Sequence, residues 1–385
     1  MSGTPLLQFL RKSKKAWNHL TDSPASLDII HIILGNESCD LDSVVSALCL
    51  GLLMHSQGTR SSCIPVLNIP REEYALKTEV TYFLSKNGIS EDLLTFRDEV
   101  DLAALHAAGR LRLTLVDHHA LPERDRPLYA SLASVTPDEP SAVAVLDHRP
   151  RDAVAAAAWP RDCEVVINVV GSCASLVGER ILALAPELFD AQVADLIRGT
   201  VLLDTACFSA QADRTTPSDT AIVSACEERG TGHASDRSAT FEDIIAARKD
   251  VSELTALQIL HKDMKVVRGL PLPGMPLLVQ DFLQRADAAE ALAALCAKHL
   301  SDAAVVMGMS FSGEASSTLR RDIAVYSAGG KEQPAKTLVE ALQKDESLQL
   351  VERPCALPGV SLFDQRNTKC SRKQVLPLVQ AALSA

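Results

Sequence analysis

Aspartate and histidine residues in four short groups are the part of this sequence best suited to catalysis or metal binding. The groups are Asp40 and Asp42 in GNESCDLD (35–42), Asp117-His118-His119, Asp147-His148-Arg149, and Asp204 in VLLD (201–204). Each group follows an apolar run that is typical of a buried strand. Because the loops at the carboxyl ends of parallel strands converge on one crevice, the four groups can contribute to a single site.

Several carboxylates in one crevice repel one another, and burial raises their pKa values, unless a multivalent cation compensates their charge. Carboxylates with a small number of imidazoles favour Mg²⁺ or Mn²⁺ over zinc bound by thiolates. Asp40 and Asp42, two positions apart, can bind two neighbouring ions. The alternative, equally open for Asp42, is a helix N-cap that accepts a hydrogen bond from a backbone N–H group.

The apolar patterning around these groups predicts an α/β fold. Strands are expected over 27–34, 63–67, 111–116, 142–146, 164–170 and 201–204, and helices from Leu41, over 79–86, and from Ser172 past Arg180. Strands that alternate with helices form a parallel sheet. The first domain, residues 1–235, is therefore predicted to be a parallel α/β domain.

A second, smaller α/β domain is expected over residues 236–385. It follows the segment 209–240, where polar and small residues without sustained apolar periodicity indicate a linker. The helices predicted after the linker are 241–267, 286–299, 335–343 and 373–383, and the predicted strands are 277–279, 303–309 and 323–326.

Length and composition limit the functions that this chain can have. Its 385 residues suit two domains, and 38 Lys and Arg residues against 49 Asp and Glu residues give a formal net charge of −11. Such a balance disfavours long nucleic acids and anionic membranes, and an aromatic content of 4% leaves little for base stacking. Residues 1–20 match neither a secretory signal nor a membrane span, so a cytoplasmic or nuclear protein is expected. The ten cysteines include no CxxC pair and are expected to be reduced and mostly buried.

Taken together, the motifs resemble those of a known superfamily. The Asp117-His118-His119 triplet, with GNESCDLDSVVSAL (35–48), VLDHRP (145–150), VGSCASLV (170–177) and VLLDT (201–205), resembles the DHH phosphoesterase superfamily. Asn36 and the DHH and DHR triplets are similar to those of animal Prune proteins, relatives of yeast exopolyphosphatase and family II inorganic pyrophosphatases. SRKQVLP (371–377) resembles the signature of the associated C-terminal DHHA2-type domain. The resemblance implies a DHH domain, a DHHA2-type domain and an active site in the cleft between them.

The resemblance also implies a centre of two Mg²⁺ or Mn²⁺ ions that cuts phosphoanhydride bonds with a metal-activated water. By motif position, Asp40 and Asp117 would bind one ion, and Asp42, Asp117, His148 and Asp204 the other, with Asp117 bridging the two. His118 and His119 are expected to orient Asp117, and direct metal binding is the alternative.

Further residues are implied to bind the phosphates of the substrate. These are Arg372 and Lys373 in the second domain, Lys265, which a helix is expected to carry, and Arg149 and Asn36 in the first. Arg149 replaces a histidine and cannot act as an acid near neutral pH, so the leaving group would take its proton from water or His119. Asn36 stands where pyrophosphatases have a metal-binding histidine. An amide oxygen is a poorer ligand for a transition metal, so adequate function with Mg²⁺ is expected.

Three functions are compatible with the motifs. The first is hydrolysis of short-chain inorganic polyphosphate, with tri- and tetrapolyphosphate favoured because no extended Lys/Arg track could hold a long polyanion. The second is a cyclic-nucleotide or oligonucleotide phosphodiesterase, which the low aromatic content disfavours. The third is a signalling scaffold, because Prune proteins are associated with nucleoside diphosphate kinase, a kinase of the glycogen synthase kinase type, cell migration and neural development. In vertebrate relatives the kinase-binding segment lies in a C-terminal tail, which is expected to be absent from this chain.

Overall fold

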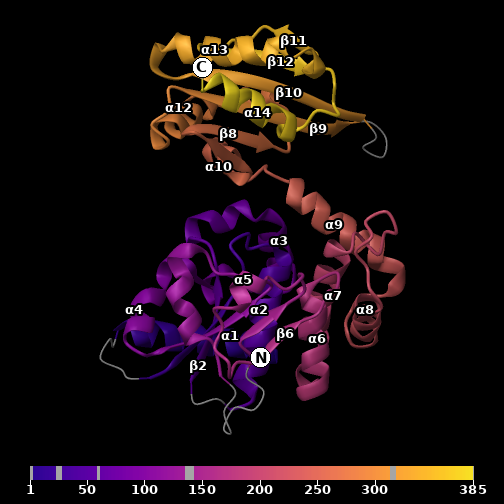
Figure 1. Ribbon diagram of the computed structural model, residues 1–385. Helices are drawn as coiled ribbons and strands as arrows, with labels where there is room; N and C mark the ends of the chain where they lie inside the picture. Colours follow the sequence, from indigo (N-terminus) through magenta and orange to yellow (C-terminus); the bar gives the residue numbers. More distant parts are fainter. Residues whose placement is uncertain (1–2, 23–27, 59–60, 135–142, 313–317, 385) are drawn as a thin grey trace. The chain divides into compact units, whose positions relative to one another are not determined.

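The chain forms two compact units, residues 1–248 and 249–385, which Figure 1 shows in a computed structural model. The structure describes residues 3–22, 28–58, 61–134, 143–312 and 318–384. The division lies at Arg248, so helix α9 (Arg237–Lys249) falls almost entirely within the first unit rather than beginning the second, as a boundary at 235 would require. Each unit contains its own six-stranded sheet.

The sheet of the first unit is parallel throughout, as predicted. Its strands are β1 (Ile30–Leu34), β2 (Ser62–Leu67), β3 (Thr95–Phe96), β4 (Leu111–Val116), β5 (Val145–Asp147) and β6 (Val165–Ile167), in the order β3-β2-β1-β4-β5-β6. Strands β1, β2 and β3 follow one another toward one edge of the sheet, and strands β4, β5 and β6 follow one another toward the opposite edge. In open α/β sheets such a reversal leaves a crevice at the carboxyl ends of the two central strands, where ligands bind.

Helices cover both faces of this sheet. They are α1 (Pro5–Asp22), α2 (Leu41–Ser56), α3 (Thr78–Lys86), α4 (Leu102–Ala107), α5 (Ala153–Ala156), α6 (Cys173–Leu184), α7 (Ala191–Asp204), α8 (Pro217–Arg229) and α9. Along β1, Ile32 and Leu34 pack into one cluster of buried side chains and Ile33 into the other. This alternation, with a period of two residues, places one apolar core on each face of the sheet.

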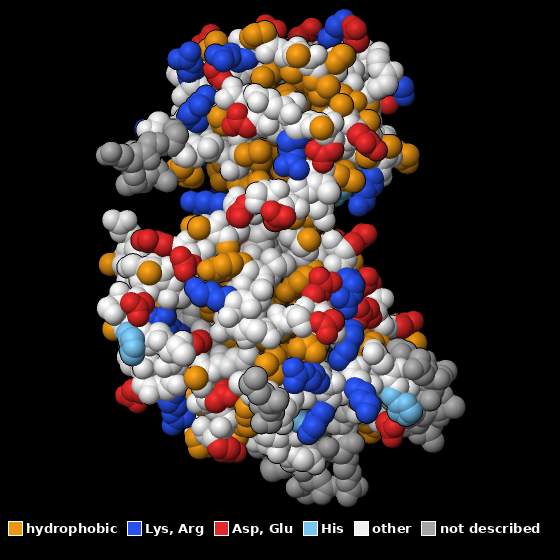
Figure 2. Space-filling model, turned by 180° about the vertical axis from the view of Figure 1, so that it is seen from behind, with side chains coloured by type: hydrophobic (Ala, Val, Ile, Leu, Met, Phe, Trp, Pro, Cys, Tyr) orange, Lys and Arg blue, Asp and Glu red, His pale blue; other side chains and the backbone are white. Residues whose placement is uncertain are grey.

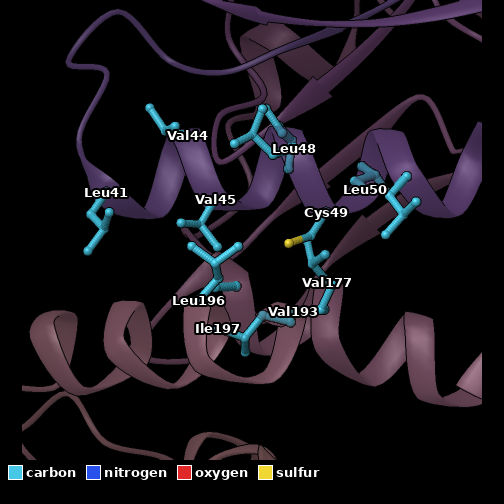
Figure 3. Close-up of a cluster of buried hydrophobic side chains, with 14 of the residues drawn as sticks. Leu41, Val44, Val45, Leu48, Cys49, Leu50, Val177, Val193, Leu196 and Ile197 are labelled. Carbon is cyan, nitrogen blue, oxygen red and sulfur yellow. The ribbon is translucent and has the colours of Figure 1, made fainter. Parts of the chain in front are cut away.

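Helix α2 is the most deeply buried helix of the first unit. Its residues from Leu41 to Met54 are all buried, as expected for a helix that is apolar on every side. Figure 3 shows Val45 and Cys49 of α2 facing Leu196 of α7 and Val177 of α6. Because α2 cannot shift without disturbing these contacts, the residues at its first turn are held firmly in place.

Two expectations for the first unit are wrong. The VLLD segment (201–204) is the last turn of helix α7 rather than a strand, because a short apolar run fits a buried helix as well as it fits a strand. The expected linker 209–240 contains helix α8, which begins with the capping box of Thr216 and Asp219 and has Pro217 at its first position. Only a narrow stripe of α8 is buried, so its sequence is mostly polar.

The sheet of the second unit is mixed. Its strands are β7 (Met264–Val267), β8 (Leu270–Met275), β9 (Ala303–Ser312), β10 (Thr318–Ser327), β11 (Leu350–Arg353) and β12 (Val360–Gln365), in the order β11-β12-β10-β9-β8-β7. Among the strand pairs of the described residues in this sheet, only the β8–β9 pair is parallel. The helices are α10 (Ala256–Lys262), α11 (Val279–Phe282), α12 (Ala288–Lys298), α13 (Glu332–Lys344) and α14 (Arg372–Ala382).

Most predicted elements of the second unit are confirmed, including the helices at 286–299, 335–343 and 373–383. The single helix expected at 241–267 is instead α9, α10 and strand β7. The strand expected at 277–279 is also wrong, because β8 ends at Met275 and helix α11 begins at Val279. The first error arises because no glycine or proline lies between 241 and 267 to separate the three elements, and the second because Pro276 follows a strand instead of opening one.

The described helices include none that is both long enough and apolar enough to cross a membrane. All ten cysteines are free thiols, and most are buried, as predicted. On the face shown in Figure 2, acidic and basic side chains are interspersed over both units.

Close packing between α7 and α3 gives a test of this fold. A Cβ atom at Gly199 would lie 2.8 Å from Cε2 of Phe83 and closer still to Cζ, so we expect Gly199→Ala to lower the free energy of unfolding by about 1–3 kcal/mol. Helix propensity alone would raise it by about 1 kcal/mol. Urea denaturation measures the difference, and an unchanged or increased stability would contradict the packing described.

Candidate active site

The acidic groups of the first unit meet at the carboxyl ends of its central strands. The segment 35–40 follows β1, Asp117 follows β4, and Asp147 is the last residue of β5. Strands β1 and β4 are neighbours, and the order of strands reverses between them. The site therefore lies where this topology favours ligand binding.

Asp42, Asp117 and His148 form the centre of the site. One potential ligand atom from each of the three lies within 4.8 Å of the others. Nε2 of His148 is 3.3 Å from Oδ1 of Asp117 and 3.7 Å from Oδ2 of Asp42. Nδ1 of His148 is 3.0 Å from the carbonyl oxygen of Val170, a contact that orients the ring. Both carboxylates are buried, so solvent does little to screen the repulsion between their negative charges.

The carboxylate of Asp42 is bound by the N-terminus of helix α6. Its Oδ2 accepts a hydrogen bond from the N–H of Cys173 at 2.7 Å, and its Oδ1 accepts one from Ala174 at 2.8 Å. The N-cap of α2 is Asp40, which accepts from the N–H of Ser43. The N-cap of α2, which is the alternative role that the sequence left open for Asp42, is therefore provided by Asp40. Asp42 instead satisfies the free amides of a helix more than a hundred residues away.

Asp117 occupies a left-handed backbone conformation with φ of 59°. This conformation is uncommon for residues other than glycine, and aspartate is among those that tolerate it best. Asn36 donates through Nδ2 to Oδ2 of Asp117 at 2.6 Å, and Nη1 of Arg149 lies 3.0 Å from Oδ1. Arg149 also donates to the backbone carbonyl of Asp117. These contacts hold the strained backbone and aim the carboxylate at Asp42 and His148.

Both ends of the Asn36 amide are engaged within the chain. Besides the bond to Asp117, its Oδ1 accepts hydrogen bonds from the backbone N–H groups of Ser38 and Cys39 at 2.9 and 3.0 Å. Asn36 thus holds the loop before α2 and links it to Asp117. To bind phosphate, as predicted, Asn36 would have to give up one of these bonds.

His119 is buried with both ring nitrogens engaged. Its Nε2 accepts from the N–H of Asp152 at 2.9 Å, which places the ring proton on Nδ1, where it is donated to Asp147. Asp147 also accepts from the N–H of His148 at 2.7 Å. The ring therefore has no free proton for a leaving group, which favours water of the two expected proton sources. Sequence reasoning did not assign Asp147 a role, although its position at the head of the DHR triplet is a signal that could have found it.

His118 lies beside the Asp42–Asp117–His148 group without belonging to it. Its Nδ1 is 3.0 Å from the carbonyl oxygen of Val116, and its buried Nε2 has no hydrogen-bond partner among the described residues. Burial lowers the pKa of His118, so the ring stays neutral. This arrangement agrees with a residue that supports the turn after β4.

Asp204 reaches the site from the end of α7 rather than from a strand. The next turn reverses direction through Ala206, Cys207 and Phe208, all of which have positive φ. Oδ2 of Asp204 is buried and has no hydrogen-bond partner in the described part of the chain. Burial, together with the charges of Asp42 and Asp40, raises the pKa of Asp204 well above its ordinary value. A buried carboxylate oxygen without a donor is a fitting ligand for a cation.

The electrostatics of the whole site also fit a divalent cation. Burial raises the pKa of Asp117 to about 8, and the charge of Asp42 adds to this rise. Burial likewise raises the pKa of Asp42. For His148, burial lowers the pKa, but the hydrogen bond to Asp117 and the charge of Asp42 outweigh it and raise the value to about 9. Without a cation, the site compensates its negative charge by retaining protons. The donors are mainly carboxylate oxygens, which suit a hard metal ion.

The predicted phosphate-binding residues of the second unit lie near one another. Arg372 is the first residue of α14, and its guanidinium binds Oδ1 of Asp263 at 2.6 Å and the carbonyl oxygen of Asp263 at 2.7 Å. Lys373 is exposed, and α14 packs against β7. Lys265 is also exposed and lies on strand β7, not on a helix as expected. Their role in binding phosphate stays a prediction.

Comparison with known proteins gives one family model and several similar chains. Residues 242–382 match the family model of the DHHA2 domain. Exopolyphosphatase PRUNE1 from Mus musculus is 38% identical over 378 residues, which cover 96% of this chain and 79% of the mouse protein. Exopolyphosphatase PRUNE1 from Homo sapiens is 38% identical over 366 residues, covering 92% of this chain and 76% of the human protein. A solved Methanococcus jannaschii structure, assigned to the family II inorganic pyrophosphatases, is 18% identical with a TM-score of 0.45, and covers 92% of this chain and 100% of that one.

The buried acidic cluster at the carboxyl ends of a parallel sheet, the DHHA2 domain and the relatives named as exopolyphosphatases together mark a hydrolase of the DHH phosphoesterase superfamily. Within that class, the identity to the mouse and human proteins over most of their length decides the branch. The chain belongs to the Prune family of exopolyphosphatases, as the motifs predicted.

The retained protons predict how metal and pH act on stability. Asp117, with an ordinary pKa of 3.8, and His148, with one of 6.5, have folded pKa values of about 8 and about 9. Both groups bind more protons in the folded state, so their stabilising contribution is lost as pH rises through these values. We expect the melting temperature of the metal-free protein to fall between pH 6.5 and 9, and Mg²⁺ to restore it most at the upper end.

Scanning calorimetry with a chelator or with added Mg²⁺ measures this effect. Asp117→Asn is the comparison variant, and its metal-free melting temperature should depend less on pH. A metal-free melting temperature that stays constant or increases over this range would contradict the assignment of the retained protons.

The contacts of Asp147 predict a second effect. Asp147→Asn replaces one carboxylate oxygen by an NH₂ group, so the side chain can no longer accept from both His119 and the N–H of His148. It also weakens the 3.3 Å ion pair with Arg149, so we expect hydrolytic activity to fall by roughly 10–100-fold. Steady-state kinetics at saturating metal measures the loss. Asp190→Asn is the matched control, because asparagine can still cap α7 at this position and activity should not change. Equal activity of the Asp147 variant and wild type would exclude this role.

Proposed function

We propose that this chain is a metal-dependent hydrolase of phosphoanhydride bonds in short-chain inorganic polyphosphate, with tri- and tetrapolyphosphate preferred. The observation that carries the proposal is the buried group of Asp42, Asp117 and His148, whose ligand atoms lie within 4.8 Å of one another. The names of the mouse and human relatives, both exopolyphosphatases, support the choice of substrate.

The residues that would hold two Mg²⁺ or Mn²⁺ ions are those implied by the motifs. Asp40 and Asp117 would bind one ion, and Asp42, Asp117, His148 and Asp204 the other. Bound there, the ions would supply an activated water and neutralise charge on the phosphoryl oxygens. The amide of Asn36 donates to Asp117 and accepts from the loop before α2, so it supplies no imidazole-like ligand for a transition metal. We therefore expect the enzyme to function with Mg²⁺ and not to require Mn²⁺.

The side chains of the chain itself contribute orientation and positive charge. Arg149 holds a permanent charge beside Asp117, and it is exposed enough to turn toward a phosphate. Arg372, Lys373 and Lys265 would bind further phosphates of the substrate. Because both nitrogens of His119 are engaged, water is the proton source for the leaving group in this proposal.

The preference for short chains rests on charge. A long polyphosphate needs an extended basic surface, whereas the net charge of −11 repels it and the face in Figure 2 mixes both signs. Two divalent ions would offset the four carboxylates locally. A short phosphate chain needs only this local compensation.

The test is metal-dependent release of phosphate by wild type and by Asp117→Asn. The amide removes the charge of the carboxylate that both ions would share, so we expect a loss of about 100-fold or more, equivalent to about 3 kcal/mol in the activation barrier. Asp195→Asn, a change of the same kind in α7, should keep wild-type activity. A fully active Asp117 variant would overturn the assignment of the site.

The substrates are compared on one preparation: tripolyphosphate, tetrapolyphosphate, long-chain polyphosphate and a cyclic nucleotide. We expect the highest kcat/KM with the two short chains. Equal turnover of long chains would contradict the length preference, and faster hydrolysis of the nucleotide would favour the phosphodiesterase alternative. If none of these substrates is hydrolysed in the presence of Mg²⁺ or Mn²⁺, the proposal is wrong.

A further inference from the structure

We propose that Asp219, a buried carboxylate outside the acidic cluster, is a positioning residue for the metal site, because it holds the first turn of α6 that binds Asp42. The inference rests on the proposed function in one respect only: it takes Asp42 to be a metal ligand.

Asp219 is fully buried near the start of α8, and both of its oxygens accept hydrogen bonds. Oδ2 accepts from the N–H of Gly171 at 2.8 Å and from the N–H and Oγ1 of Thr216 at 2.8 and 2.7 Å. Oδ1 accepts from Oγ of Ser175 at 2.6 Å. Four donors on one carboxylate compensate the cost of burying it.

Two of these donors lie on either side of the amides that bind Asp42. Gly171 precedes helix α6, and Ser175 lies in its first turn. Between them are Cys173 and Ala174, whose N–H groups donate to the Asp42 carboxylate. By holding the chain at 171 and at 175, Asp219 fixes the direction in which the two intervening amides point.

The packing around Gly171 is close enough to leave no room for a side chain. A Cβ atom there would lie 2.6 Å from Cγ2 of Thr205, 2.8 Å from Oδ2 of Asp219 and 2.9 Å from the carbonyl oxygen of Arg214. Thr205 directly follows Asp204. The segment that Asp219 holds is therefore in contact with the chain beside a second acid of the site.

Asp219 also completes the capping box of α8, so a purely structural role is the competing explanation. The two roles predict different results. A cap stabilises the fold without acting on the metal, whereas a positioning residue changes the affinity of the metal site when its contacts to α6 are removed.

The experiment compares Asp219→Asn, Ser175→Ala and the control Asp195→Asn in the full chain. Asparagine presents an NH₂ group where Asp219 now accepts hydrogen bonds, and Ser175→Ala removes only the 2.6 Å contact to α6 while the capping box remains. Asp195 is a matched control because its carboxylate accepts from the N–H of Thr231 at 2.9 Å and so joins α7 to the end of α8, away from Asp42.

Binding of Mn²⁺ is measured by titration calorimetry, and thermal unfolding is measured without metal. We expect the dissociation constant for Mn²⁺ to rise by roughly 10–100-fold in Asp219→Asn and by about 10-fold in Ser175→Ala, and to stay at the wild-type value in Asp195→Asn. At saturating metal, kcat should remain within a few-fold of wild type.

Variants that melt at lower temperature but bind Mn²⁺ with wild-type affinity would reduce Asp219 to a structural cap and overturn the inference. If Asp219→Asn does not fold, the Mn²⁺ affinity of Ser175→Ala decides in the same way. Wild-type protein that binds Mn²⁺ but releases no phosphate from any polyphosphate would contradict the proposed function and leave the metal-binding comparison intact. The two failures are therefore distinguishable.

Discussion

The bond between the Asp42 carboxylate and the first amides of α6 is the interaction on which the site depends. It joins the first turn of α2, which follows β1, to a helix that follows β6, at opposite sides of the switch in strand order. The helix gains an acceptor for amides that would otherwise be unsatisfied, and the buried acid gains donors. The burial of helix α2 holds Asp42 in place, and the contacts of Asp219 hold the first turn of α6, so the carboxylate and the amides keep their relative positions.

The site buries several acids together, and neighbouring groups reduce the cost of burying them. His148 and Arg149 supply positive charge next to Asp117, and Asn36 supplies a neutral donor. Burial raises the pKa values of Asp117 and Asp204, so without a cation the cluster retains protons. The fold therefore holds carboxylates that can exchange their protons for a cation, which is the property that a cation site needs.

Sequence alone predicted the parallel sheet and the convergence of the acids, because β-branched runs such as 30–34 end directly at polar groups. It misplaced Asp204, since the four residues VLLD fit a strand and a helix equally well. It missed α8, of which only Ile222, Val223, Cys226 and the polar Asp219 are buried. The partnership of Asp42 with α6 could not be predicted, because its donors are backbone amides that almost every residue carries.

That partnership has a consequence for how the sequence can change. Cys173 and Ala174 bind Asp42 through N–H groups, so replacing their side chains does not remove the donors. Packing still limits the size of residues at these buried positions, but their chemistry is free. Proline is the exception, because it has no N–H group. The contact is thus insulated from the chemistry of most single substitutions at two of the three residues that form it, and the requirement for a particular functional group falls on the acid alone.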